Sequence, residues 1–183
     1  MGKMVQLTAS DGHTFGAYRA EPAGKPKGGL IVVMEIFGVN HHIRDVAERY
    51  AHEGYLAIAP AMFDRYSRDF DVGYGADDMT KAFAIYPKID MPKAVLDIEA
   101  ARAAAVGVGK IGVVGFCFGG TAAWLAATRL KFDAAACYYG GGIAGFASEK
   151  PACPVILHFG SKDSHIPMAK VEELKKAQPN VPV

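Results

Sequence analysis

One cysteine stands between two glycines in a pattern that points to nucleophilic chemistry. Cys117 has Gly115 two residues before it and Gly119 two residues after it. This is the Gly-x-Ser-x-Gly pattern of hydrolytic nucleophiles with sulfur in place of oxygen. Such a nucleophile sits on a strained turn between a strand and a helix, where side chains at the two glycines would collide with neighbouring backbone. The motif predicts that Cys117 forms a covalent bond with an acyl carbon.

The same position predicts how the thiol is activated. A cysteine at a helix N-terminus faces unpaired N–H groups, and these favour thiolate over thiol and lower the cysteine pKa. The alternative interpretation is that Cys117 is a small buried side chain in a glycine-rich turn. A phosphate-binding turn is disfavoured because the segment contains neither Gly-x-Gly-x-x-Gly nor a terminal Gly-Lys-Ser/Thr.

The elements that must hold this turn alternate along the chain. A hairpin is predicted around Ser10-Asp11-Gly12, and a loop over 61–75. Buried strands are expected at 29–34, 55–59, 111–115, 134–139 and 155–159, and helices at 41–53, 77–85, 91–106, 121–129 and 167–177. The order predicts an α/β protein with a mostly parallel sheet, helices on both faces and chemistry at the carboxyl ends of the strands.

Composition limits the class of protein. With 183 residues, 51% of them hydrophobic, the chain fits one domain spanning 1–183. A formal net charge of +1 disfavours nucleic acid as a partner, and no apolar segment is long enough for a membrane span, so we expect a cytoplasmic protein. Three cysteines without a Cys-x-x-Cys pair disfavour both a disulfide framework and a metal site.

Several motifs occur together and in a fixed order. They are Met34-Glu35-Ile36-Phe37-Gly38, Ala57-Ile58-Ala59-Pro60, Gly115 to Gly120, Tyr138-Tyr139-Gly140, and His158 to Asp163 followed by Ile166-Pro167. With these motifs the chain resembles the dienelactone hydrolase family over essentially its whole length. The resemblance implies an α/β-hydrolase fold that needs no cofactor or metal and cleaves small esters or lactones.

The resemblance also assigns roles to individual residues. It implies that Cys117 is the nucleophile, that Asp163 orients a catalytic histidine, and that Glu35 is the partner of the resting thiol. A carboxylate near a nucleophilic thiol is also what tuning its protonation requires. The alternatives are a solvated or helix-capping acid for Glu35 and an ordinary turn aspartate for Asp163. The oxyanion hole is expected from the backbone N–H groups of Phe118 and Ile36.

The expected histidine is the first departure from the family pattern. It should follow the acid on the loop after the last strand, roughly ten residues beyond Val183. None of the six histidines fits: His165 shares the turn of Asp163, His158 lies in or ends a strand, and His41 and His42 could at most face the cleft. We therefore expect a C-terminally incomplete domain that lacks its last strand and helix, and the alternative is a version without a general base.

The second departure concerns the substrate. In relatives that cleave dienelactone, an arginine that grips the substrate carboxylate and a nearby tyrosine lie where Met79 and Phe83 stand here. These two residues and Phe37 are the expected substrate contacts. Lys81, Arg65 or Arg68 could supply the missing cation, although each is more often a solvated surface charge. Dienelactone itself is thus a disfavoured substrate.

Three classes of function remain open. The leading hypothesis is a thiol hydrolase, a monomer or homodimer, acting on small esters or lactones. The absent histidine motivates a non-catalytic binding protein instead. A thiol redox protein would require Cys117 to pair with Cys137 or Cys153.

Overall fold

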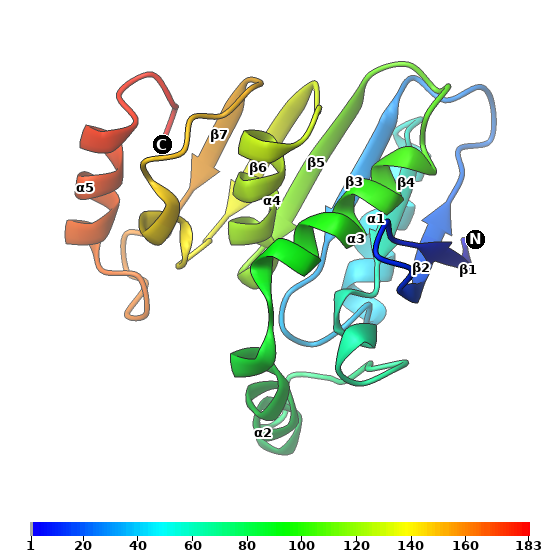
Figure 1. Cartoon of the computed structure of the whole chain (residues 1–183), viewed down its shortest axis with the longest axis horizontal. Coiled ribbons are helices and arrows are strands. Elements are labelled where there is room, and N and C mark those ends of the chain that lie inside the picture. Colours follow the sequence, from blue (N-terminus) through cyan, green and yellow to red (C-terminus); the bar gives the residue numbers. More distant parts are fainter. Residues whose placement is uncertain (1) are drawn as a thin grey trace.

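Seven strands form one sheet, in the order β1-β2-β4-β3-β5-β6-β7 (Figure 1). The computed structural model describes residues 2–183. The strands are β1 (Lys3–Thr8), β2 (Thr14–Ala20), β3 (Gly29–Val33), β4 (Leu56–Pro60), β5 (Ile111–Phe116), β6 (Ala134–Tyr138) and β7 (Val155–His158). β1 pairs antiparallel with β2, and β2 pairs antiparallel with β4. All other neighbours run parallel, which confirms the mostly parallel sheet.

Five α-helices and three short 3-10 helices connect the strands. The α-helices are α1 (His41–His52), α2 (Ala76–Ile85), α3 (Met91–Ala103), α4 (Phe118–Arg129) and α5 (Met168–Ala177), and the 3-10 helices are η1 (Met62–Arg65), η2 (Tyr86–Lys88) and η3 (Ile143–Phe146). Most boundaries lie within one residue of the prediction, but α3 ends at Ala103 rather than at Val106. α4 begins at Phe118 rather than at Thr121, and the two glycines of its first turn, whose helix propensity is low, explain why the sequence did not indicate this start. η1 lies inside the segment predicted as a loop.

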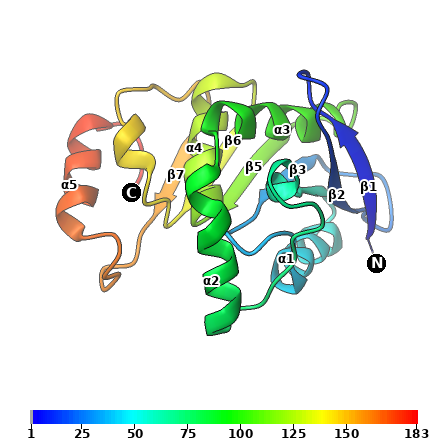
Figure 2. The same cartoon turned by 60° about the horizontal axis from the view of Figure 1, so that its bottom comes forward.

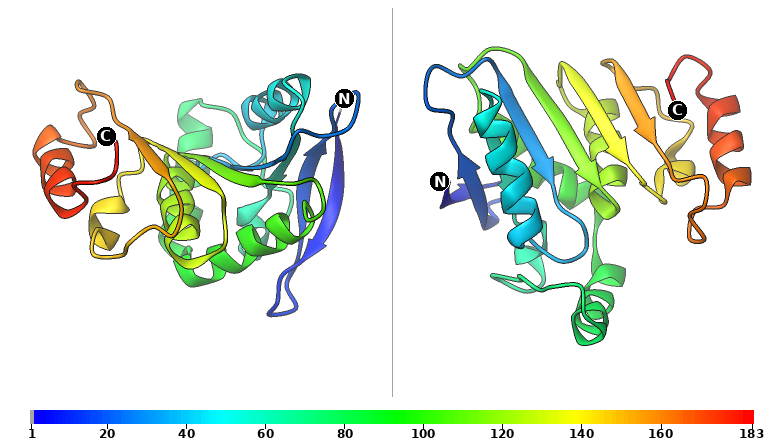
Figure 3. Two further views of the ribbon diagram at one scale, coloured as in Figure 1. Left: turned by 90° about the horizontal axis from the view of Figure 1, so that it is seen from above. Right: turned by 180° about the vertical axis from the view of Figure 1, so that it is seen from behind.

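Helices lie on both faces of the sheet, as predicted (Figure 3). α1 contacts β2, β3 and β4 on one face, while α3 and α4 pack on the other. β6 and β7 alternate accordingly, with Cys137 and Leu157 buried beneath α4 and with Ile156 exposed on the opposite face. On that opposite face, no helix within residues 2–183 covers β5, β6 and β7 (Figure 3).

A very close approach of backbone fixes the turn between β5 and α4. A Cβ atom at Gly115 would lie 1.9 Å from the carbonyl oxygen of Gly119. A Cβ atom at Gly119 would lie 2.4 Å from the carbonyl oxygen of Val33 and 2.5 Å from that of Met34. The two glycines therefore allow the start of α4 to pack against the ends of both β5 and β3, as the motif predicted.

A buried ion pair ties three distant segments together. The Arg65 guanidinium of η1 donates to both carboxylate oxygens of Asp97 on α3, at 2.8 and 2.7 Å, and Asp97 is fully buried. The same guanidinium donates to both oxygens of Asp11 in the hairpin turn, at 2.8 and 3.1 Å. This hydrogen bonding lowers the pKa of Asp11 to about 2.

We predict that Gly119→Ala destabilises the protein strongly. The added methyl group would meet two carbonyl oxygens of the sheet, and overpacking of this kind costs about 1–3 kcal/mol or more. Gly145→Ala is the matched control, because a Cβ atom at Gly145 meets nothing within 4 Å. Urea unfolding of both variants measures the difference, and equal free energies of unfolding would contradict the packing argument.

Arg65→Met should leave the Asp97 carboxylate buried without its partner. We expect a loss of about 3–5 kcal/mol in the free energy of unfolding at pH 7. Burial raises the pKa of Asp97, so the deficit should shrink as the pH falls and the carboxyl group takes up a proton. Arg49→Met removes an exposed ion pair with Asp45 and should cost under about 1 kcal/mol. A pH-independent deficit for Arg65→Met would overturn this assignment.

Candidate active site

Cys117 occupies the strained turn that its motif predicted. It directly precedes α4 with φ 56° and ψ −118°, a backbone conformation that L-residues rarely adopt. Its N–H donates to the carbonyl oxygen of Tyr138 at 3.0 Å. Its carbonyl oxygen accepts from the N–H groups of Gly120 (3.0 Å) and Thr121 (3.3 Å). These bonds hold the strained residue from both sides, and its side chain is half-buried.

The expected direction of the Cys117 pKa was wrong. Burial raises the pKa of the thiol, and the carboxylates of Glu35 and Asp163 raise it further. The N–H of Phe118 acts in the opposite direction by hydrogen bonding to the sulfur. The helix N-terminus does favour the thiolate, but desolvation and two nearby negative charges outweigh it. The resting cysteine is therefore a thiol.

Two tyrosine hydroxyls hold Glu35, which follows β3. The Tyr74 hydroxyl donates to one carboxylate oxygen at 2.6 Å, and the Tyr139 hydroxyl donates to the other at 3.3 Å. Burial and this hydrogen bond raise the pKa of Tyr74 to about 12. Glu35 is thus neither a helix cap nor a fully solvated acid. It acts on the Cys117 thiol through space, with no hydrogen bond between them in the described part of the chain.

Tyr74 was missed from the sequence because it lies in an aperiodic loop. Backbone contacts tie this loop to the segment after β3: the Val72 N–H donates to the Phe37 carbonyl oxygen at 3.1 Å, and the Asn40 side-chain amide donates to the Val72 carbonyl oxygen at 3.1 Å. The Tyr74 ring packs edge-on against Phe37, with centroids 4.6 Å apart. No local pattern could have revealed these contacts, although Tyr139 belongs to one of the motifs that carry the resemblance.

Asp163 lies in the turn after β7. One of its carboxylate oxygens accepts from the N–H groups of His165 (2.8 Å) and Ile166 (3.3 Å). Across residues 2–183, the other oxygen accepts no hydrogen bond. The imidazole of His165 is exposed, and that of His158 stacks on Tyr138 with centroids 4.4 Å apart. Neither imidazole is hydrogen-bonded to Asp163 or to Cys117.

Of the two N–H groups expected to form an oxyanion hole, that of Phe118 is hydrogen-bonded to the Cys117 sulfur and that of Ile36 has no acceptor within the described residues. The N–H groups of Ile36 and Phe118 donate to no carbonyl or side-chain oxygen within the described residues. Both residues are buried, so these donors are desolvated. Because Gly119 packs on the carbonyl oxygens of Val33 and Met34, the start of α4 lies beside the chain that leads to Ile36. Buried N–H groups beside a nucleophile can stabilise a developing oxyanion.

Aromatic side chains surround the elbow. The ring of Tyr86 contacts that of Phe118 edge-on, with centroids 6.3 Å apart. Burial and the neighbouring Cys117 raise the pKa of Tyr86. Phe37 is buried against Tyr74, whereas Met79 and Phe83 on α2 are exposed.

The three candidate cations are all engaged elsewhere. Arg65 is held by Asp97 and Asp11, as described above. Arg68 donates to the carbonyl oxygen of Thr14 at 2.8 Å. Lys81 lies 3.9 Å from Asp78 on the same helix. None of them replaces the arginine that the family pattern places on this helix.

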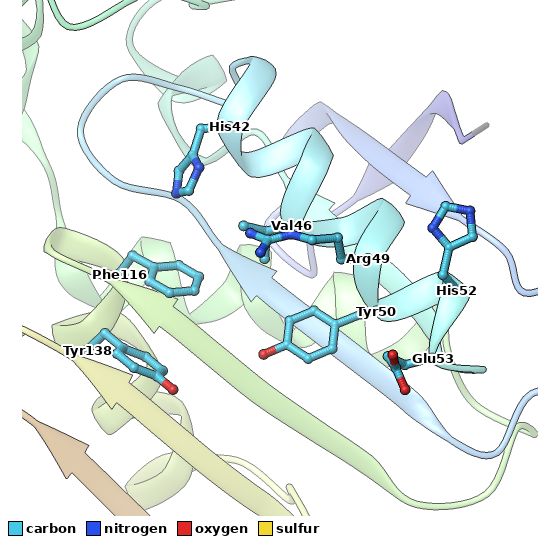
Figure 4. Close-up of a pocket in the computed structure, with 8 residues that line it drawn as sticks. All are labelled: His42, Val46, Arg49, Tyr50, His52, Glu53, Phe116 and Tyr138. Carbon is cyan, nitrogen blue, oxygen red and sulfur yellow. The ribbon is translucent and has the colours of Figure 1, made fainter.

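A separate hollow of about 510 Å³ lies between α1 and the strands β5 and β6 (Figure 4). Its lining comprises His42, Val46, Arg49, Tyr50, His52, Glu53, Phe116 and Tyr138. The His42 ring lies 6.4 Å from that of Phe116, and Cys117 is not part of the lining. Within residues 2–183 no three metal-ligating side chains gather, and none of the helices described is long and apolar enough to span a membrane.

A strained residue on a sharp turn between a parallel strand and a helix, with a glycine two residues to either side, is the arrangement typical of the α/β-hydrolase class. The family model of the dienelactone hydrolase family matches residues 15–181. The chain belongs to the dienelactone hydrolase family.

Individual relatives agree with this assignment. A Synechocystis sp. protein provisionally named carboxymethylenebutenolidase is 37% identical over 163 residues, covering 81% of this chain and 66% of its own length. The carboxymethylenebutenolidase of Pseudomonas putida is 32% identical over 174 residues, covering 89% and 72%. A crystal structure provisionally described as a Klebsiella pneumoniae dienelactone hydrolase gives a TM-score of 0.80 at 29% identity, covering 97% and 81%. The chain thus spans about two thirds of the length of the first relative.

Glu35→Gln should lower the pKa of the Cys117 thiol, because it removes a negative charge while keeping the side-chain shape. More thiolate at pH 8 should speed alkylation of Cys117 by iodoacetamide, by up to about tenfold for each unit of pKa. Peptide-resolved mass spectrometry would follow the rate. Cys153, whose pKa is raised by burial and by Asp133, serves as the internal reference. An unchanged ratio between the two cysteines would show that Glu35 does not control the thiol.

Proposed function

We propose that this protein hydrolyses small carboxylic esters or lactones through a thioester at Cys117. The observation that carries the proposal is the pair of N–H groups, on Ile36 and Phe118, that donate to no oxygen within the described residues and accompany a strained and half-buried thiol. Family membership supports it, since relatives bear the name carboxymethylenebutenolidase. A thiolate can attack an acyl carbon without a metal or an organic cofactor, and the thiol is therefore a suitable nucleophile for this reaction.

Acylation begins when the thiol passes its proton to a base, in the family pattern the histidine, which later returns this proton to the leaving group. The Cys117 sulfur then donates an electron pair to the carbonyl carbon, and the carbonyl oxygen takes up the negative charge. The N–H groups of Ile36 and Phe118 donate hydrogen bonds to this oxyanion. When the tetrahedral intermediate collapses, the carbon–oxygen bond to the leaving group breaks, the leaving alkoxide takes up a proton and a thioester remains.

Deacylation returns the free thiol. Water adds to the thioester carbonyl, the same N–H groups stabilise the second oxyanion, and the carbon–sulfur bond breaks to release the acid. In the family pattern a histidine removes the proton from this water, and Asp163 orients that histidine. The unpaired oxygen of the Asp163 carboxylate suits that role, since one lone pair remains for an imidazole N–H.

The two tyrosines give Glu35 a role in this cycle. Their hydroxyls at 2.6 and 3.3 Å keep the Glu35 carboxylate hydrogen-bonded. We propose that its charge holds the resting cysteine as a thiol and thereby limits side reactions of an exposed thiolate. A substrate that separates Glu35 from the sulfur would then release the nucleophile.

A non-catalytic binding protein is the second candidate. It is favoured by one observation, that neither Asp163 nor Cys117 is hydrogen-bonded to a histidine imidazole within residues 2–183. In that case the elbow and its aromatic surroundings would bind acyl compounds without cleaving them.

Incubation with p-nitrophenyl acetate separates the two functions. A hydrolase should release p-nitrophenol with acetylation of the peptide that contains Cys117, and Cys117→Ala should abolish both. Because burial raises the pKa of the thiol, acetylation should speed up as the pH rises from 7 to 9. Cys153→Ala is the control and should react like the unaltered protein. Absence of any Cys117 adduct at pH 9 would favour the binding protein.

A further inference from the structure

Three large apolar side chains form a stripe on α2. Met79, Phe83 and Tyr86 are spaced four and three residues apart, so they share one face of the helix and of its 3-10 extension. Their exposed fractions are 39%, 55% and 43%. Ala82 and Ile85 bury the neighbouring face against the rest of the protein. Because the stripe is not needed for the core, its exposed apolar surface requires another explanation.

The stripe leads to the nucleophile. α2 stands beyond the carboxyl ends of the parallel strands, at the same end of the sheet as the elbow (Figure 2). Tyr86 closes the stripe, and its ring contacts Phe118, the residue that follows Cys117, with centroids 6.3 Å apart. An acyl group bound at the thiol would therefore extend along Tyr86 towards Phe83.

The charged groups that act on the Cys117 thiol are both negative. Glu35 and Asp163 both act on the Cys117 sulfur, and both disfavour a further negative charge there. Arg65 and Arg68 are hydrogen-bonded to other groups, and the exposed Lys81 lies 3.9 Å from Asp78, so none of the three is held beside the thiol as a partner for a substrate carboxylate. An anionic acyl group would have to give up water near two carboxylates without a compensating cation.

We propose that this site selects uncharged esters or lactones with an apolar acyl group, which binds along Met79, Phe83 and Tyr86, and that it rejects compounds carrying a carboxylate near the reacting carbonyl. This inference deepens the proposed function and rests on it for the reaction. The discrimination between neutral and anionic reagents at the Cys117 sulfur, however, does not depend on hydrolysis. It can be measured without any turnover.

The first experiment compares two alkylating reagents of similar size. Iodoacetamide is neutral and iodoacetate is an anion, and both form one carbon–sulfur bond with loss of iodide. Peptide-resolved rates at Cys117 should favour iodoacetamide about tenfold or more beyond the preference of free glutathione, which corresponds to about one pKa unit of electrostatic discrimination. Raising the salt concentration should narrow the gap. A Cys117 preference equal to that of glutathione would overturn the electrostatic part of the proposal.

Two arginine variants test the direction of approach. Phe83→Arg places a cation on the stripe and should raise the iodoacetate rate at Cys117 several-fold while changing the iodoacetamide rate little. Ala84→Arg adds the same charge to an exposed position away from the stripe and should leave the ratio unchanged. Equal effects of the two variants would show that net charge, and not the stripe, controls access.

The second experiment uses esters. p-Nitrophenyl butyrate and p-nitrophenyl hydrogen succinate share their acyl chain length but differ in a terminal carboxylate. Acylation of Cys117 should be at least about tenfold faster with the butyrate, and Phe83→Arg should reverse part of the difference. Equal acylation rates would reject the inference but leave the hydrolase in place. If neither ester acylates Cys117 while the alkylation preference holds, the proposed hydrolysis fails and the selectivity of the site stands.

Discussion

The contact between the start of α4 and the ends of β3 and β5 is the constraint on which the site depends. Gly115 and Gly119 leave no space for a side chain, so backbone packs directly on backbone. This approach fixes Cys117 in a strained conformation with φ 56°. It also places the start of α4, with the N–H group of Phe118, beside the chain that leads to Ile36. The proposed nucleophile and the proposed oxyanion donors would thus be positioned by one packing contact.

Opposing effects at the elbow act on the protonation of the Cys117 thiol. The N-terminus of α4 favours a thiolate, whereas burial and the carboxylates of Glu35 and Asp163 favour a thiol. The net effect is a raised pKa, which favours the protonated thiol. The hydroxyl groups of Tyr74 and Tyr139 donate to the Glu35 carboxylate, one of the two negative charges that favour the thiol. The arrangement explains how the Cys117 thiol can be half-exposed and yet remain protonated.

Much of this architecture could be predicted from the sequence, because its signals are local. Alternating strands and helices gave the mostly parallel sheet, and the spacing of Gly115, Cys117 and Gly119 located the elbow. The pKa direction of Cys117 was wrong, because burial of the thiol raises its pKa and two carboxylates from other loops raise it further through space. Tyr74 was missed since its loop has no periodicity. The roles of Asp163 and Glu35 remain predictions, although both carboxylates lie close enough to act on the thiol.

The hydrogen bond from Tyr74 to Glu35 couples a surface loop to the nucleophile. The loop reaches this point through a backbone contact with Phe37 and a hydrogen bond from the Asn40 side chain, so its position and that of the Glu35 carboxylate are not independent. By thermodynamic linkage, any change in the loop that alters the position of the Glu35 charge would also alter the proton affinity of Cys117, and the reverse would hold to the same extent. The position of the loop and the protonation of Cys117 would therefore be thermodynamically coupled.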